Sequence, residues 1–146
     1  MKTILDKNNL ELTIQRLSYQ LLENHGDFSE TVLIGLQPRG IYLADKIVNQ
    51  LKSLNPKYKI KYGKLDITFY RDDIRKELRI ANNTDISFSI EDKKVILIDD
   101  VLYTGRTIRA ALDALLSFGR PKKVELCVLI DRKFSRQLPI QPDYWG

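Results

Sequence analysis

Two adjacent carboxylates and a short turn of hydroxyl and glycine residues follow an apolar run. Asp99 and Asp100 come directly after residues 95–98, four apolar residues typical of a buried strand. A Thr-Gly-Arg-Thr turn follows at residues 104–107, and a helix is predicted over residues 105–118. In an α/β sheet, ligands collect at the carboxyl ends of the strands. The segment therefore places two acids and a phosphate-sized cradle at one point, which fits a sugar phosphate.

The predicted turn is suited to an anion. Backbone N–H groups at a helix start are unpaired and carry the positive end of the helix dipole, so a phosphate is stabilised there without a charged side chain. Gly105 lets the backbone approach the anion, and the hydroxyls of Thr104 and Thr107 can donate to its oxygens. Asp99 and Asp100, if partly buried, need donors, which ribose hydroxyls would supply. The alternative is a capping turn with two solvated carboxylates.

Strands and helices alternate around this segment. Apolar runs predict strands at residues 31–36, 65–69, 94–98 and 123–130. Helical spacing predicts helices at residues 10–21 and 40–52, besides the one at residues 105–118. Asn8 or Asn9 would cap the first helix, and Gly26 would end it. The alternation predicts one α/β domain, residues 1–146, with a mostly parallel sheet flanked by helices on both faces.

Two stretches carry a weaker signal. Charged residues and asparagines dominate residues 71–91, which predicts a long, mobile connection. The tail, residues 131–146, shows no clear period. The Gly-x-x-x-x-Gly-Lys pattern of a Walker A loop is absent from the whole sequence, which argues against an ATPase or GTPase.

Composition fits an ordinary globular protein. Hydrophobic residues make up 43% and charged residues 29% of the 146 positions, and no stretch approaches the ~20 apolar residues of a membrane span. The start of the chain has no secretory signal pattern, and Cys127 is the only cysteine, so we expect a cytoplasmic protein with Cys127 as a core residue. The net charge of +5 suits an anionic ligand or RNA, or equally a solvated basic surface.

Other catalytic patterns are missing from the sequence. His25 is the only histidine and falls at a predicted helix end, where a cation near the negative pole of the dipole has a common, non-catalytic role. No cluster of histidine, cysteine and acid suggests a zinc site. No Ser-His or Cys-His pairing suggests acyl transfer.

Residues 95–107 resemble the phosphoribosyl-pyrophosphate (PRPP) binding motif of the type I phosphoribosyltransferases. Residues 35–44, Gly-Leu-Gln-Pro-Arg-Gly-Ile-Tyr-Leu-Ala, are similar to the pyrophosphate loop of the PyrR family. Residues 65–73 are similar to that family's entry into its flexible loop, and the likeness continues through residues 112–115, 119–121, 129–132 and 138–140. PyrR proteins pair uracil phosphoribosyltransferase activity with RNA-binding control of pyrimidine genes. The resemblance implies the type I fold, with a flexible lid loop and a small C-terminal hood.

The resemblance also implies a set of site residues. PRPP would be bound by Val101, Leu102, Tyr103, Thr104, Gly105, Arg106 and Thr107. The pyrophosphate loop would be Pro38, Arg39 and Gly40, with a cis peptide within it, and Asp99, Asp100 and Arg39 would carry catalysis. The lid would be residues 71–84, with Arg71, Asp72 and Asp73, and it would exclude water. Asp131 and Arg132 would orient the base, although an ordinary surface ion pair is an alternative.

The implied reaction converts uracil and PRPP to UMP and pyrophosphate. Mg²⁺ would be held mainly by the substrate and by water, as magnesium prefers. The protein would form a homodimer or a larger assembly of dimers. The alternatives are an RNA-binding regulator with little or no catalysis, and a phosphoribosyltransferase for another base. Tyr103 stands where purine enzymes usually carry an acid facing the base, which counts against hypoxanthine and guanine.

The sequence departs from the family pattern in three places. PyrR chains typically continue well past Asp-Tyr-x-Gly, so the hood and the uracil pocket would be truncated at Gly146, and Trp145 replaces a smaller apolar residue. On the first helix, Gln15 and Tyr19 stand where attenuating members carry Thr and His. A basic pair in the tail is reduced to Ser135-Arg136. The last two departures count against RNA control.

Overall fold

The computed structural model describes residues 6–67 and 84–146. The elements follow one another in the order α1 (Lys7–His25), β1 (Thr31–Gln37), α2 (Gly40–Leu54), β2 (Lys61–Asp66), β3 (Lys94–Leu102), α3 (Arg106–Leu115), β4 (Lys123–Asp131), the 3₁₀ helix η2 (Lys133–Ser135) and β5 (Tyr144–Trp145).

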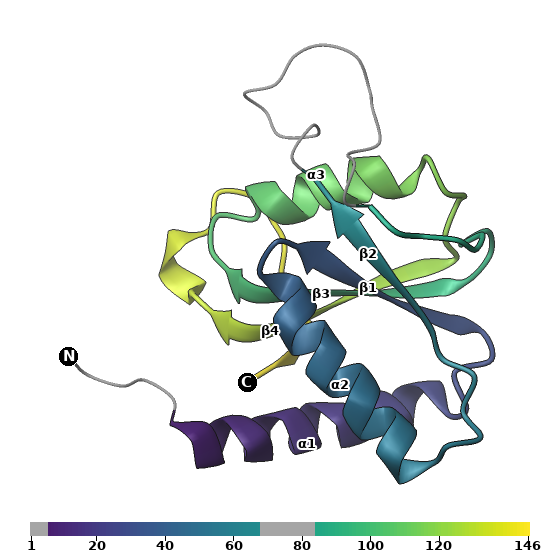
Figure 1. Cartoon of the computed structure of the whole chain (residues 1–146). Coiled ribbons are helices and arrows are strands. Elements are labelled where there is room, and N and C mark those ends of the chain that lie inside the picture. Colours follow the sequence, from purple (N-terminus) through teal and green to yellow (C-terminus); the bar gives the residue numbers. More distant parts are fainter. Residues whose placement is uncertain (1–5, 68–83) are drawn as a thin grey trace.

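The five strands form one parallel sheet with the order β2-β1-β3-β4-β5. β3 lies in the middle, and its register pairs Leu97 with Ile34 of β1 and with Leu126 of β4. Helices α1 and α2 lie on one face of the sheet and α3 lies on the other (Figure 1). This arrangement confirms the predicted α/β fold with helices on both faces.

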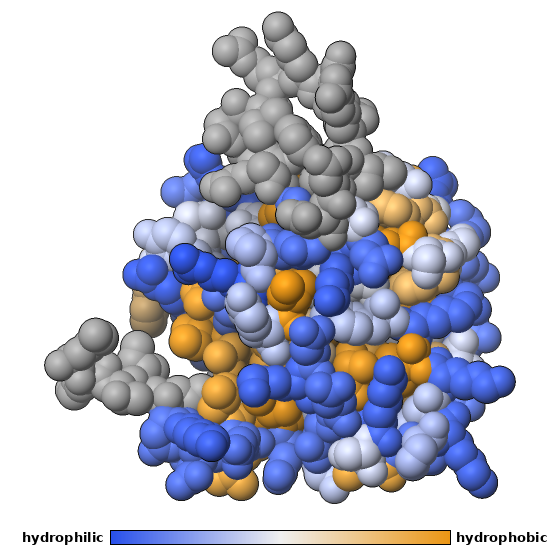
Figure 2. Space-filling model, in the orientation of Figure 1, coloured by the Kyte–Doolittle hydropathy of each residue, from blue (hydrophilic) through white to orange (hydrophobic). Residues whose placement is uncertain are grey.

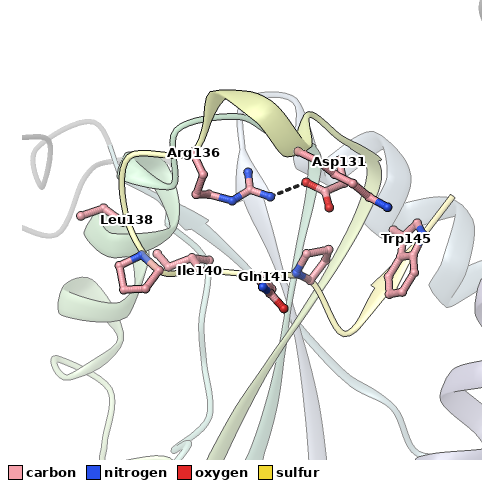
Figure 3. A pocket seen from close by; sticks show the side chains of 9 residues that line it. Asp131, Arg136, Leu138, Ile140, Gln141 and Trp145 are labelled. Atoms are coloured by element: carbon pink, nitrogen blue, oxygen red, sulfur yellow. Dashed lines mark hydrogen bonds and ion pairs between the residues drawn. The ribbon is translucent and has the colours of Figure 1, made fainter.

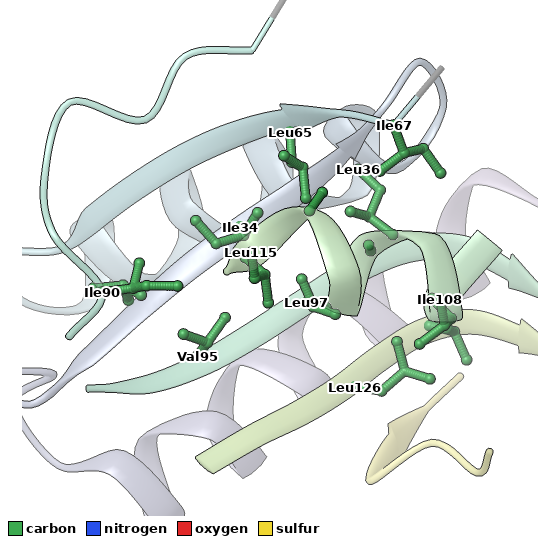
Figure 4. Close-up of a cluster of buried hydrophobic side chains, with 14 of the residues drawn as sticks. Ile34, Leu36, Leu65, Ile67, Ile90, Val95, Leu97, Ile108, Leu115 and Leu126 are labelled. Carbon is green, nitrogen blue, oxygen red and sulfur yellow. The ribbon is translucent and has the colours of Figure 1, made fainter. Parts of the chain in front are cut away.

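Each face of the sheet has its own hydrophobic core. Val95 and Leu97 of β3 pack under α3 with Ile108 and Leu115 (Figure 4). The alternate residues Ile96 and Ile98 pack on the opposite side against α1 and α2. β3 is continuously apolar because both of its faces are covered. Cys127 is fully buried in the second core, as predicted, and burial raises the pKa of its thiol to about 12.

The helix ends differ in detail from the predictions. Asp6, and not Asn8 or Asn9, caps α1, because its carboxylate accepts a hydrogen bond of 2.8 Å from the Asn9 N–H. Gly26 ends α1 as predicted. α3 ends three residues before Phe118 because residues 116–118 form a tighter turn, in which each N–H donates to the carbonyl three positions back.

The edge strand β2 begins earlier than predicted. Its register runs from Lys61, opposite Val32, to Asp66, opposite Gln37, so the predicted strand lacks the polar first half of β2. An edge strand needs less burial than a central one, and lysines are common there. The predicted strand at residues 65–69 shares only Leu65 and Asp66 with β2, and residues 68 and 69 lie outside the described part.

The prediction of a mobile connection over residues 71–91 is wrong for its last part. Ile90 is fully buried in the core under α3, and Ile86 and Phe88 pack against that core. Lys64 and Asp85 exchange two backbone hydrogen bonds of 2.9 and 2.7 Å, which attach the segment to β2. The apolar residues at every second position therefore anchor this segment despite its charged neighbours.

The surface carries polar and apolar side chains side by side. Figure 2 shows apolar residues among hydrophilic ones on the face where α1 and α2 lie. In the two described stretches of chain, none of the helices combines the length and the apolar character that a membrane span requires.

Candidate active site

Asp99 and Asp100 lie near the carboxyl end of the central strand. β3 continues past the predicted strand end at residue 98 and includes both acids. Asp99 is only 7% exposed, and its Oδ1 accepts a hydrogen bond of 2.8 Å from the Asp100 N–H. Asp100 is half-buried, and its Oδ1 accepts a bond of 2.7 Å from the Val101 N–H. The backbone thus holds one oxygen of each carboxylate.

The surroundings of Asp99 favour its neutral form. Burial raises the pKa of this carboxyl to about 7, and the adjacent Asp100 charge adds to the effect, although the bond from the Asp100 N–H opposes it. A group that is costly to charge in the free protein is one that gains from donors or a cation brought by a ligand. The charged form of Asp99 is therefore disfavoured in the free protein.

The loop at residues 38–40 lies between β1 and α2, beside the acids. Gly40 begins α2 and is packed against the end of β3: a Cβ there would lie 2.9 Å from the Cα of Asp99. The cis peptide is the Gln37–Pro38 bond, which is one bond before the predicted Pro38-Arg39-Gly40 segment. Arg39 is exposed, and with Asp100 it lines a hollow of about 370 Å³. The structure thus brings the predicted loop and the two acids together.

The turn after β3, residues 103–105, leads directly into α3. Gly105 has a φ of 96° and precedes α3, a conformation that side-chain-bearing residues rarely adopt. The Thr104 hydroxyl accepts a hydrogen bond of 3.2 Å from the Arg106 N–H. Within the described chain, the N–H groups of Thr104 and Gly105 donate to no protein acceptor. Two backbone donors are thus available at the start of a helix.

The remaining residues of the predicted PRPP segment differ in how far they are exposed. Leu102 is buried in the core under α3, so any role it has in binding falls to its backbone. Val101 is half-buried, whereas Arg106 and Thr107 are exposed at the start of α3. Arg106 donates from Nε to the Gln137 side chain at 2.8 Å.

The predicted base-orienting residues lie next to this turn. Asp131 stands opposite Leu102 in the β3–β4 register and forms an ion pair with Arg136. The guanidinium of Arg132 lies over the ring of Tyr103, 4.2 Å from its centroid. The ion-pair partner of Asp131 is thus Arg136, and Arg132 stacks on Tyr103.

A second hollow of about 370 Å³ lies beneath the segment that follows β4 (Figure 3). Asp131, Arg136 and Trp145 line it, together with residues 138–142. The sequence did not indicate this hollow, nor the contacts of Arg136 and Gln137 with the turn. Only the fold shows that residues 132–142 return to residues 103–106.

Some predicted site residues are not placed. Arg71, Asp72 and Asp73 of the predicted lid lie outside the described residues. Thr84, at the far end of that range, is described, and its hydroxyl accepts a bond of 2.9 Å from the Asp66 N–H. Among residues 6–67 and 84–146, no group of three or more metal-ligating side chains occurs.

His25 lies far from this site and has hydrogen-bond partners of its own. Its ring nitrogens lie 2.9 Å from the Thr31 hydroxyl and 2.6 Å from the Glu125 carboxylate. Tyr144 donates a third bond, of 2.9 Å, to Glu125. Because Thr31 and Glu125 lie at the amino ends of their strands, this cluster is at the edge of the sheet opposite the acids.

Known proteins resemble this chain in sequence and in fold. The Phosphoribosyl transferase domain family matches residues 1–146. Among solved structures, a hypoxanthine phosphoribosyltransferase from Staphylococcus aureus superposes with a TM-score of 0.79 at 21% identity, covering 99% of this chain and 76% of that one. One from Trypanosoma cruzi superposes with a TM-score of 0.79 at 17% identity, covering 99% and 79%. The fold is that of a type I phosphoribosyltransferase.

Similarity to curated proteins defines the group more narrowly. The chain is 47% identical to the Bifunctional protein PyrR of Ligilactobacillus salivarius, over 99% of this chain and 83% of that protein. It is 48% identical to the Bifunctional protein PyrR of Acetivibrio thermocellus, over 98% and 78%. The chain belongs to the PyrR family.

Proposed function

We propose that the protein transfers the phosphoribosyl group of PRPP to uracil, giving UMP and pyrophosphate. The observation that carries the proposal is the juxtaposition of Asp99 and Asp100 with two unpaired amides, at Thr104 and Gly105, on one strand-turn-helix segment. A ribose 5-phosphate has hydroxyls for the acids and an anion for the amides. Membership of the PyrR family supports the choice of reaction class.

The ribose and its phosphate would occupy the end of β3. The amides of Thr104 and Gly105, with those of Arg106 and Thr107, would hold the 5′-phosphate at the positive end of α3. Asp99 and Asp100 would accept from the ribose hydroxyls. Because the ribose becomes cationic as pyrophosphate leaves, the negative charge of Asp100, and of Asp99 when it is ionised, would stabilise the transition state more than the ground state.

The pyrophosphate would lie across from the ribose at residues 38–40. Arg39 is exposed and unpaired within the described chain, so its guanidinium is available to a phosphate oxygen. A magnesium ion would take most of its ligands from substrate and water, as magnesium prefers. The ion would neutralise the charge that develops on the leaving group.

The base would lie near Tyr103. Tyr103 is 48% exposed as a residue, and its ring is already in contact with the Arg132 guanidinium, so the pair forms a platform of the kind that stacks on planar heterocycles. Tyr103 offers no carboxylate, which favours a pyrimidine over hypoxanthine or guanine. Asp131 is already engaged by Arg136, so we assign the direct contact with the base to Tyr103 and Arg132.

RNA control is the less supported alternative. Arg136, the remaining member of the family's basic pair, is held by Asp131, and its side chain is only 16% exposed. A side chain that binds nucleic-acid phosphates must be accessible, so that its positive charge can neutralise them. A cytoplasmic homodimer or a larger assembly of dimers remains our expectation, and sedimentation of the purified protein would test the stoichiometry.

A direct assay tests the proposed reaction. Protein, Mg²⁺, PRPP and uracil are mixed, and release of pyrophosphate is measured. We expect turnover by the native protein, its loss in Asp100→Asn, and near-native turnover in Asp113→Asn, which removes an exposed acid from the outer face of α3. Competition among uracil, guanine, hypoxanthine and orotate identifies the base. Absence of turnover with all four bases would refute the proposal.

A further inference from the structure

The segment of residues 132–142, here called the strap, returns from β4 across the turn at residues 103–106. Its backbone and side chains make hydrogen bonds to that turn at several points. The N–H groups of Gln137 and Leu138 donate to the Thr104 carbonyl at 2.8 and 3.2 Å. The Arg136 guanidinium donates to the Tyr103 carbonyl at 2.6 Å. The strap thus contacts two successive carbonyls of the turn that we assign to phosphate binding.

Arg136 connects the strap to both β4 and the turn. One terminal nitrogen donates to the Tyr103 carbonyl and the other forms the ion pair with Asp131 (Figure 3). The side chains are 16% and 8% exposed, so the pair is largely buried. Its planar fork reaches two acceptors at fixed positions, which the ammonium of a lysine cannot do. Arg136 therefore fixes the Tyr103 carbonyl relative to the end of β4.

The position of a carbonyl determines the direction of the next amide. In a trans peptide the C=O and the following N–H point to opposite sides. Because the strap holds the carbonyls of Tyr103 and Thr104 on its own side, the N–H groups of Thr104 and Gly105 point away from it. Those two N–H groups are the ones that donate to no acceptor within residues 6–67 and 84–146.

The strap also supports Gly105 by direct packing. A Cβ at Gly105 would lie 3.3 Å from the Leu138 Cβ and 3.4 Å from the Ile140 Cδ1, so the strap covers that side of the glycine. Arg106 is held in turn by Gln137. Every residue from Tyr103 to Arg106 therefore has a contact with the strap.

We propose that Arg136 is a positioning residue for phosphoribosyl binding, which acts by holding the Tyr103 carbonyl so that the Thr104 and Gly105 amides face the 5′-phosphate. The proposal rests on the proposed function in one respect, namely that the turn binds the phosphate of the sugar. It assigns to Arg136 a role through the backbone, without any contact with substrate.

Binding of two separate anions to the full-length protein tests the role. Ribose 5-phosphate probes the turn, and inorganic pyrophosphate probes the loop of Arg39, each by calorimetric titration. In Arg136→Ala we expect the affinity for ribose 5-phosphate to fall about tenfold or more, because misdirected donors lose their hydrogen bonds. Affinity for pyrophosphate should stay within about twofold of native. Arg120→Ala, which removes an exposed charge elsewhere, should leave both affinities at their native values.

Equal weakening of both anions in Arg136→Ala, or no change in either, overturns the proposal. If that variant does not fold, Arg136→Lys is measured in its place. Lysine keeps the charge beside Asp131 but not the fork, so the affinity for ribose 5-phosphate should still fall, and a native affinity overturns the proposal.

Amide spectra separate this inference from the proposed function. In nitrogen-15 spectra recorded without ligand, the Thr104 and Gly105 resonances of the Arg136 variant should shift while those of α2 stay in place. If the native protein binds neither anion, the proposed function fails. If the two resonances do not move, the positioning role fails.

Discussion

Gly40 and Asp99 are in direct contact, and the contact joins the loop after β1 to the end of β3. A Cβ on Gly40 would lie 2.5 Å from the Ile98 carbonyl oxygen and 2.9 Å from the Asp99 Cα, closer than any side chain tolerates. The first residue of α2 is therefore a glycine because the strand backbone occupies the space of a side chain. The contact fixes the distance between the Arg39 loop and the two acids.

Gly40→Ala is predicted to separate these two parts of the site. Relief of the clash requires a backbone shift, which costs about 1–3 kcal/mol in the free energy of unfolding. We expect pyrophosphate release to fall by about 100-fold, because a shift of about 1 Å misplaces reacting groups to that extent. Steady-state assays and urea unfolding measure the two effects. Gly26→Ala is the matched control, since that position has a strained φ of 58° but lies at the far end of α1. Equal activity losses in both variants would contradict the prediction.

Asp99→Asn is predicted to change the pH dependence of stability. The carboxyl has a pKa of about 7 in the folded protein, because burial disfavours its charge, and near 3.8 in the unfolded chain. Between these values the folded state binds more protons, so the free energy of unfolding falls as pH rises to about 7. The variant lacks this fall. It should therefore be more stable than native above pH 7, by on the order of 2–4 kcal/mol, and similar near pH 4. Urea unfolding at a series of pH values tests this; parallel curves would refute it.

Glu125→Gln is predicted to have the opposite pH dependence. Burial alone would raise the pKa of Glu125, but hydrogen bonds from Tyr144 and His25 outweigh it and hold the pKa below 4.5. The stabilisation is present above pH 4.5 and is lost as pH falls through the folded-state pKa. The variant should lose about 1–3 kcal/mol at pH 7, and the loss should shrink in acid. Glu30→Gln, at an exposed ion pair with Lys93, should change stability by less than about 1 kcal/mol.

The Glu125 variant should also retain its activity. Glu125 lies at the amino end of β4, opposite the edge that carries Asp99, so native pyrophosphate release is expected once the protein is folded. A loss of turnover with an unchanged melting temperature would show that this cluster acts on the site, contrary to our assignment.

Tyr103→Leu is predicted to raise the KM for uracil and to leave the KM for PRPP nearly unchanged. Without the ring, Arg132 loses its stacking partner and the base loses its platform, so the KM for uracil should rise about tenfold. The KM for PRPP should stay within about twofold, because the turn is held through the Tyr103 backbone. Tyr103→Phe keeps the ring and should behave as native. A rise in the KM for PRPP alone would contradict the assignment.

Much of the fold was predictable because its signals are local. Residues 95–98 are apolar on both faces, and the alternation of such runs with helical periods indicates a parallel sheet. The start of β2 is not predictable from the sequence because Lys61 and Lys64 have no apolar period, and pairing with β1 decides their structure. The anchoring of residues 84–91 is not predictable for a related reason, since Ile90 becomes buried only when α3 covers it.

The candidate site likewise has some features that the sequence predicts and others that only the fold shows. The sequence by itself determined that two acids, a glycine and two threonines lie within residues 99–107, where a strand is followed by a helix, because these residues are close together in the chain. Only the tertiary structure decided that Gly40 lies against Asp99, that Arg132 covers Tyr103, and that Arg136 holds the turn. Those partners are more than 25 residues apart in the chain, and long-range packing of strand ends brings them together. The spacing of residues along the sequence does not indicate such contacts.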